Sequence, residues 1–156
     1  MNFIETSRAS YRPQNITTLF VGESAPVSGE FFYQGKTALR RYMEKALSFD
    51  SFESFKARGW YLDDLVLTPV NGLSKTERRL QCEGAVTSLA ARIAEYRPQA
   101  IVSLMKGIEP LVNAAAKRAE SDAPCFSVPF PGQGQQRKFL REMEKILPML
   151  PRIVKP

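Results

Sequence analysis

The chain has 156 residues, of which 44% are hydrophobic and 24% charged, a composition typical of a globular protein with its own core. It contains no histidine, which excludes a Ser-His-Asp triad, a Cys-His dyad and imidazole metal ligands. The formal net charge of +6 weakly favours an anionic partner such as nucleic acid. We therefore predict a single domain over residues 1–156.

The cysteine content and the N-terminus indicate the compartment. Cys82 and Cys125 are too few for a tetrahedral zinc site, and we expect both to be inert, reduced thiols in the core. The first 14 residues lack the apolar segment of a signal peptide, and no apolar run is long enough to span a membrane. We expect a cytoplasmic monomer without membrane contact.

The first predicted strand ends on an acidic turn. Residues 17–22 form a run of β-branched, aromatic and aliphatic side chains that ends at Gly22, followed by Glu23 and, shortly after, Pro26. Three aromatic residues occupy positions 31–33. In open parallel sheets, ligands bind beyond the carboxyl ends of the strands. We therefore expect Glu23 at the mouth of a cleft, close to flat apolar rings.

Helix and strand patterns alternate along the rest of the chain. Spacing and turn residues predict helices over residues 39–47 and 51–58, a strand over 65–68, a long helix over 75–96, a strand over 100–104, a helix over 108–119, a strand over 125–128 and a last helix over 135–147. Residues 1–15 and 148–156 are interpreted as arms. The inward stripe of the long helix is expected to contain Leu80, Val86, Leu89, Ala90 and Ile93. This alternation predicts an α/β fold, a three-layer helix–sheet–helix sandwich around a mainly four-stranded parallel sheet.

Three loops should converge at one edge of this sheet: residues 22–33, 68–75 and 129–137. The chain resembles the uracil-DNA glycosylase superfamily over residues 17–147. The resemblance depends on the glycine–acid turn with its proline and aromatic residues, on the segment over residues 97–104, and on a proline-rich turn before the last helix. None of these motifs is unique alone, but their order and spacing are fairly specific.

The resemblance implies removal of uracil or another modified base from DNA, as in base excision repair. It also implies that the chain uses no metal and no cofactor. Such enzymes flip the nucleotide into a pocket, where an aromatic ring stacks on the base. Glu23 matches the catalytic acidic position that stabilises the sugar cation or orients water. The expected base-binding residues are Gly22, Ser24, Phe31, Phe32, Thr68 and Asn71. The expected DNA-binding residues are Lys75, Arg78, Gly132, Gln133, Gly134, Gln135 and Arg137.

The sequence also departs from the family pattern. Pro26 lies four residues after Gly22, where members usually have three, and Thr68 stands where many members have asparagine. The usual His-Pro-Ser turn is replaced by residues 130–134, which leaves only glutamine side chains or backbone amides as donors to the leaving base. A neutral donor is weaker than a charge-assisted one by about 1 kcal/mol.

These departures leave alternatives open. The chain is either a slow or atypical glycosylase, a binding module of the same fold without catalysis, or an enzyme acting on free nucleosides or nucleotides. Each site residue also has a structural interpretation: Glu23 as a helix cap or the partner of a surface arginine, the rings at 31–33 as core, and the basic residues as solvated helix faces.

Overall fold

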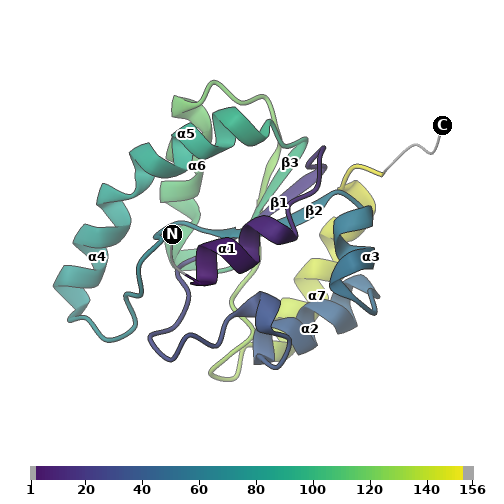
Figure 1. Ribbon diagram of the computed structural model, residues 1–156, viewed down its shortest axis with the longest axis horizontal. Helices are drawn as coiled ribbons and strands as arrows, with labels where there is room; N and C mark the ends of the chain where they lie inside the picture. The colour runs from purple at the N-terminus through teal and green to yellow at the C-terminus, as the bar shows by residue number, and fades with distance from the viewer. Residues whose placement is uncertain (1–2, 153–156) are drawn as a thin grey trace.

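Four parallel strands form the central sheet of the computed structural model, which describes residues 3–152 (Figure 1). The strands are β1 (Thr18–Gly22), β2 (Trp60–Asp64), β3 (Ala100–Ser103) and β4 (Cys125–Ser127), in the spatial order β2-β1-β3-β4. All three pairings are parallel, as expected when helices connect successive strands. The predicted α/β fold with a four-stranded parallel sheet is confirmed.

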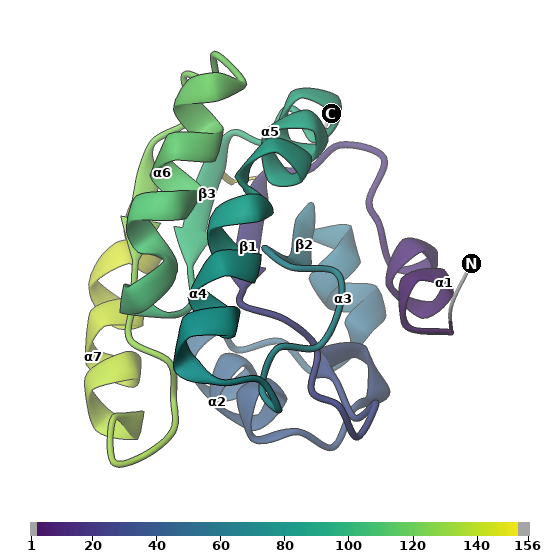
Figure 2. The same ribbon diagram turned by 90° about the vertical axis from the view of Figure 1, so that its left-hand side faces the viewer.

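Helices cover both faces of this sheet (Figures 1 and 2). One face carries α2 (Ala38–Leu47), α3 (Phe52–Ala57) and α7 (Gln136–Ile146), and the other carries α5 (Val86–Tyr96) and α6 (Glu109–Arg118). The helix α4 (Lys75–Gly84) continues from α5 away from the sheet, and α1 (Phe3–Ser10) lies beside the edge strand β2. Three short 3-10 helices complete the set: η1 (Phe32–Gln34), η2 (Lys106–Ile108) and η3 (Leu147–Met149).

The core forms because both faces of the sheet are apolar. Every residue of β1 is buried, and Phe20 packs against Phe55 and Trp60. On the same side, Phe139, Met143 and Ile146 of α7 are buried. None of the helices within residues 3–152 has the length and apolar character needed to cross a membrane.

The prediction for the second strand was wrong. The strand is Trp60–Asp64, and residues 65–68 follow it. The strand ends with two buried aspartates, Asp63 and Asp64. Charged residues are not typical of a buried strand, so the apolar pattern favoured the more hydrophobic segment after them. Leu65 and Val66 still donate backbone hydrogen bonds to the carbonyls of Gly22 and Glu23, which explains why they are apolar and buried.

Four further predictions need correction. The long helix is divided at Gly84 and Ala85 into α4 and α5, and Leu80 is 56% exposed instead of facing inward. Glycine is a poor helix former, which accounts for the break.

The N-terminal arm contains the helix α1. In the C-terminal arm Leu150 is buried, and residues 153–156 lie outside the described range. Cys82 is buried as expected, but Cys125 is exposed.

Candidate functional site

A cavity of about 320 Å³ opens at the carboxyl ends of the strands. Its walls include Glu23 after β1, Asp64 at the end of β2, Met105 after β3 and Phe130 after β4. This is where an open parallel sheet binds ligands. Its volume lies at the lower end of the roughly 300–1,000 Å³ range of ligand sites, which suits a ligand of nucleoside size.

The carboxylate of Glu23 is held by a helix from the far side of the cavity. Arg78 of α4 donates from Nε to Oε2 of Glu23 at 2.8 Å and from Nη2 to Oε1. The Cys82 thiol donates to the same Oε2 at 3.7 Å, and burial together with the Glu23 charge raises the pKa of that thiol to about 11. Glu23 thus lines the cavity as the partner of an arginine. Oε2 accepts from both Arg78 and Cys82, so it is Oε1 that keeps a lone pair to accept from water or from a ligand.

Aromatic rings form one wall of the same cavity. Phe31 and Phe32 both line it and are buried. Phe32 packs against Tyr33 and Phe52, so its ring is also part of the core. Phe130 lines the cavity from the opposite loop and is half exposed. The structure therefore brings the acid and the rings of residues 22–33 together with the loop before α7.

A second acidic group, Asp64, forms part of the cavity floor. Its Oδ2 accepts from Nη2 of Arg8 at 2.6 Å. Arg8 is 2% exposed, although arginine is among the residues least often buried, and it also contacts Glu5 and, at 3.5 Å, Asp63. The N-terminal helix α1 therefore supplies a cation to an acidic side chain that lines the cavity.

Asp63 points to other partners. Its Oδ2 accepts from Arg92 and from the Tyr96 hydroxyl, each at 2.9 Å, and its Oδ1 accepts from the backbone N–H of Asp64 at 2.7 Å. Both carboxylate oxygens of Asp63 therefore have hydrogen-bond donors. Asp64 receives a side-chain hydrogen bond from Arg8, and burial, opposed by Arg8 and reinforced by Asp63, raises the pKa of Asp64 to about 7.

The other predicted base-binding residues have mixed positions. Gly22 and Ser24 line the cavity, and the Ser24 hydroxyl accepts from the backbone N–H of Val70 at 3.3 Å. Asn71 lines it as well, but its Oδ1 accepts from the Val27 backbone, so the amide also serves to join two loops. Thr68 is exposed and is not among the cavity-lining residues.

Next to the cavity lies a second hollow of about 590 Å³, here called the basic trough. It shares Arg78, Met105 and Phe130 with the cavity and adds Lys106 and Lys138. Of the predicted DNA-binding residues, Arg78, Gly132, Gln133 and Gln135 line the trough, and Lys75, Gly134 and Arg137 do not. The Lys106 ammonium group already donates to the Ser127 carbonyl at 2.9 Å and lies 3.6 Å from Glu142.

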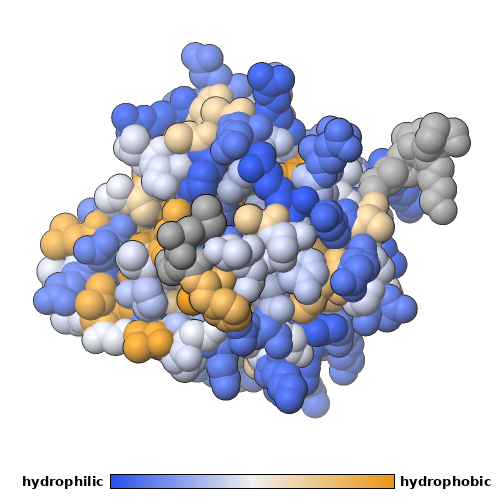
Figure 3. Space-filling model, in the orientation of Figure 1, coloured by the Kyte–Doolittle hydropathy of each residue, from blue (hydrophilic) through white to orange (hydrophobic). Residues whose placement is uncertain are grey.

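The loops that line the cavity carry exposed apolar side chains. Val27, Leu67 and Leu73 belong to the loops after β1 and β2, and all three are exposed. Figure 3 shows apolar surface in the region of α4 and its neighbouring loops. Solvent-exposed apolar groups around a cavity are typical of a surface that meets a ligand or partner.

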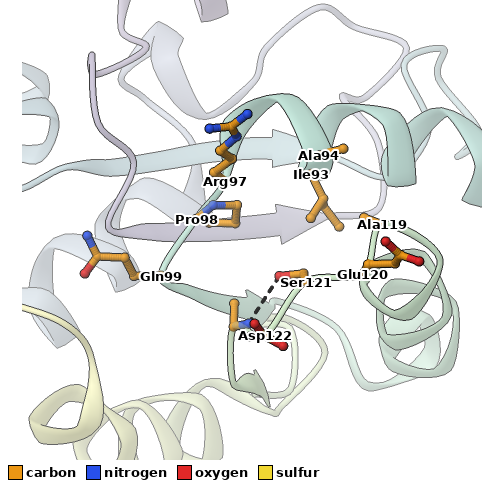
Figure 4. A pocket seen from close by; sticks show the side chains of 10 residues that line it. Ile93, Ala94, Arg97, Pro98, Gln99, Ala119, Glu120, Ser121 and Asp122 are labelled. Carbon is orange, nitrogen blue, oxygen red and sulfur yellow. Dashed lines mark hydrogen bonds between the residues drawn. The ribbon is translucent and has the colours of Figure 1, made fainter.

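A further hollow of about 520 Å³ lies at the opposite edge of the sheet (Figure 4). Its walls come from residues that precede β3 and β4, including Arg97, Glu120 and Asp122. Ser121 there accepts from the Ala123 backbone at 3.2 Å. It shares no residue with the cavity at the carboxyl ends, and its acidic side chains are exposed. Within residues 3–152, no group of three or more Cys, Asp and Glu side chains is arranged to hold a metal ion.

Sequence reasoning missed Asp64, Arg8 and Met105 as parts of the site. The acidic doublet at 63–64 was a usable signal, because two charges directly after an apolar segment need partners if that segment is a strand. Arg8 had no such signal, since its aspartate partners lie more than 50 residues away. Neither the known protein families nor the curated proteins contain a match to this chain.

Proposed function

We propose that this chain is a DNA glycosylase of the uracil-DNA glycosylase type, which releases uracil or another modified base from DNA. One observation carries the proposal: two carboxyl groups, of Glu23 and Asp64, share a nucleoside-sized cavity with the rings of Phe31 and Phe32. A planar base fits against the aromatic wall, and the sugar would lie near the carboxylate of Glu23.

The chemistry follows from this arrangement. As the bond between base and sugar breaks, its electron pair leaves with the base and the sugar gains oxocarbenium character. Glu23 stabilises that positive charge and accepts a hydrogen bond from the water that attacks the sugar. The water oxygen bonds to the sugar carbon, one proton of the water passes to Glu23, and the products are a free base and an abasic sugar.

The surroundings of the cavity support a nucleic-acid substrate. The basic trough continues from the cavity through Arg78 and presents Lys138, which suits the phosphates that flank a flipped nucleotide. The exposed apolar side chains of Val27, Leu67 and Leu73, on loops that line the cavity, offer a surface for bases left unstacked by the flip.

A second candidate function, a binding module without catalysis, is favoured by the pairing of Glu23 with Arg78. Because the guanidinium contacts both carboxylate oxygens, it offsets the negative charge that the sugar cation requires. The binding module predicts salt-dependent binding of DNA without base release.

The test is release of free base from single- and double-stranded oligonucleotides that contain uracil, hypoxanthine or xanthine. We expect the wild-type protein to release at least one of these bases and Glu23→Gln to lose at least about 100-fold in rate. Glu120→Gln, an exposed change at the opposite edge of the sheet, is the matched control and should match the wild type. If no base is released from any oligonucleotide, the glycosylase proposal fails; salt-dependent binding would then favour the second candidate.

A further inference from the structure

We infer that Asp64 is the acid of the cavity, a neutral carboxyl group that donates a hydrogen bond from Oδ1 to the departing base, and that Arg8 is the residue that positions it. The inference rests on the proposed base-excision function. Asp64 supplies a charge-neutralising donor to the leaving base, which the chain otherwise lacks because it has no histidine and the loop over residues 130–134 offers only neutral amides. The Asp64 side chain is 8% exposed and lines the cavity, so the exposed part of its carboxyl group is accessible to a ligand.

The contacts of the carboxyl group decide which oxygen carries the proton. Oδ2 accepts from the Arg8 guanidinium at 2.6 Å, and a proton on that oxygen would compete with the cation. The proton of the neutral form therefore belongs on Oδ1. Gly22 keeps space open at this oxygen, because a Cβ atom at position 22 would lie only 2.6 Å from Oδ1.

The charge balance of the cluster explains why Asp64, rather than Asp63, is neutral. Two cations, Arg8 and Arg92, face three carboxylates, those of Glu5, Asp63 and Asp64. Asp63 and Asp64 are adjacent and both buried, and the negative charge of a neighbouring carboxylate favours uptake of a proton. Asp63 has the larger set of donors, so the neutral form is favoured at Asp64. Burial raises the pKa of Asp64 in the same direction.

Several other groups lie near Asp64, its cavity or its charged neighbours Arg8 and Asp63. They come from α1, the loop after β1, η1, β2, α4 and α5, and they are Glu5, Arg8, Glu23, Tyr33, Tyr61, Asp63, Arg78, Arg92 and Tyr96. The pKa values of the three tyrosines are all raised, chiefly by burial, so these residues remain neutral near pH 7 and the arginines remain charged. Asp64 thus changes its protonation near neutral pH while these tyrosines and arginines do not.

The step balances in atoms and charge. The bond between base and sugar breaks with its electron pair going to the base, and the Oδ1 proton of Asp64 is shared with, or passes to, an oxygen or nitrogen of that base. Asp64 becomes a carboxylate, which Arg8 stabilises, while water adds to the sugar and gives its proton to Glu23. Solvent then takes the proton from Glu23 and returns one to Asp64.

The first arm of the experiment does not depend on activity. It follows the carboxyl carbon of Asp64 by NMR as a function of pH, with Asp64→Asn used to assign the resonance. We expect a midpoint near pH 7. Arg8→Gln should move the midpoint upward by about one pH unit or more, since a nearby cation is lost, and Arg8→Lys should restore it. If Arg8→Gln does not fold, Arg8→Lys and Asp64→Asn still test the assignment. A wild-type midpoint near the ordinary aspartate value would overturn the inference.

The second arm measures base release from the oligonucleotides named above as a function of pH. The wild-type rate should fall as the pH rises through the Asp64 midpoint, because the ionised carboxylate has no proton to donate. Asp64→Asn should lose this dependence, since an amide donates at every pH, and Asp64→Ala should release base at least about tenfold more slowly near pH 6. Asp122→Asn, exposed at the opposite edge, is the control (Figure 4).

The two arms separate the failure of this inference from that of the proposed function. If the wild type releases base and Asp64→Asn keeps the wild-type pH profile, the role of Asp64 is overturned and base excision stands. If no oligonucleotide loses a base, excision itself is overturned, whatever the NMR titration shows.

Discussion

Arg78 of α4 and Glu23 after β1 form a two-point ion pair across 55 positions of the chain. The pair closes one side of the cavity and joins α4 to the sheet. Most side chains of α4 are exposed, and of its residues only Cys82 is buried. The ion pair is therefore a main attachment of this helix, and the position of α4 depends on it.

We expect Arg78→Met to loosen α4 locally. The Arg78 side chain is 40% exposed, so solvent screens the pair and the free energy of global unfolding should fall by no more than about 1 kcal/mol. Amide hydrogen exchange within α4 should nevertheless become several-fold faster, because local opening no longer breaks the pair. Arg79→Met is the control, since Arg79 makes only a more exposed pair with Glu83 at 3.8 Å on the same helix. Equal exchange in α4 of both variants would contradict this role of Arg78.

We expect the stability of the protein to decrease with rising pH through Asp64. Burial raises the pKa of Asp64 from 3.8 to about 7, so between these values the folded state binds a proton that the unfolded state has lost. The free energy of unfolding therefore falls as the pH rises from about 4 to about 7, by an amount on the order of a few kcal/mol, and this contribution is constant above that range.

Asp64→Asn checks this dependence, because asparagine does not titrate. Urea unfolding at about pH 5 and about pH 8 should show that the variant gains stability relative to the wild type at the higher pH. A constant difference between the two proteins at both pH values would contradict the raised pKa.

We expect Gly22→Ala to disturb the cavity through Asp64. The added Cβ would lie 2.6 Å from Oδ1, so the aspartate has to move away from its place beside Arg8. Urea unfolding should show a loss of about 1–3 kcal/mol. Removing the obstacle with Asp64→Ala should make the two changes strongly non-additive. Gly84→Ala is the control: no atom lies within 4 Å of its Cβ, and a gain of up to about 1 kcal/mol is expected for a helical position.

We expect Tyr33→Phe to weaken the edge strand β2. The Tyr33 hydroxyl accepts a hydrogen bond from the Leu62 backbone N–H at 2.8 Å, and both groups are buried. Loss of the hydroxyl leaves that N–H without an acceptor, at a cost of about 1–3 kcal/mol. Tyr42→Phe on α2 is the control, and an equal effect of both changes on urea unfolding would show that the hydroxyl of Tyr33 has no special role.

The fold could be predicted because its signals are local. Three of the four strands and most helices follow from apolar spacing and from turn residues such as Gly22. The second strand could not be placed in this way, because Asp63 and Asp64 are tolerated inside only through Arg8 and Arg92, which are distant in sequence. Gly84 is a weak helix former, and this property indicated where the long helix could break. The exposure of Leu80 was not predictable in this way, because it depends on how α4 lies relative to the sheet.

The site was only partly predictable for the same reason. Topology alone brings Glu23, Phe31 and Asn71 to one cavity, since all three follow strands that end at the same edge. The identity of the arginine that pairs with Glu23 was not predictable. Arg78 belongs to a cluster of basic residues, and such a cluster after a strand-end loop favours the prediction of DNA binding. The contribution of Arg8 required knowing that α1 folds against β2.

The position of α1 beside β2 has a practical consequence. A strand at the margin of a sheet attracts strands from other molecules unless something covers it, and uncovered margins promote aggregation. Trimming residues 1–15, an ordinary step when a shorter version is prepared for crystallisation, would remove this cover together with the cation that Asp64 needs. Preparations meant for functional work should therefore retain the whole N-terminal helix and carry any purification tag at the other end.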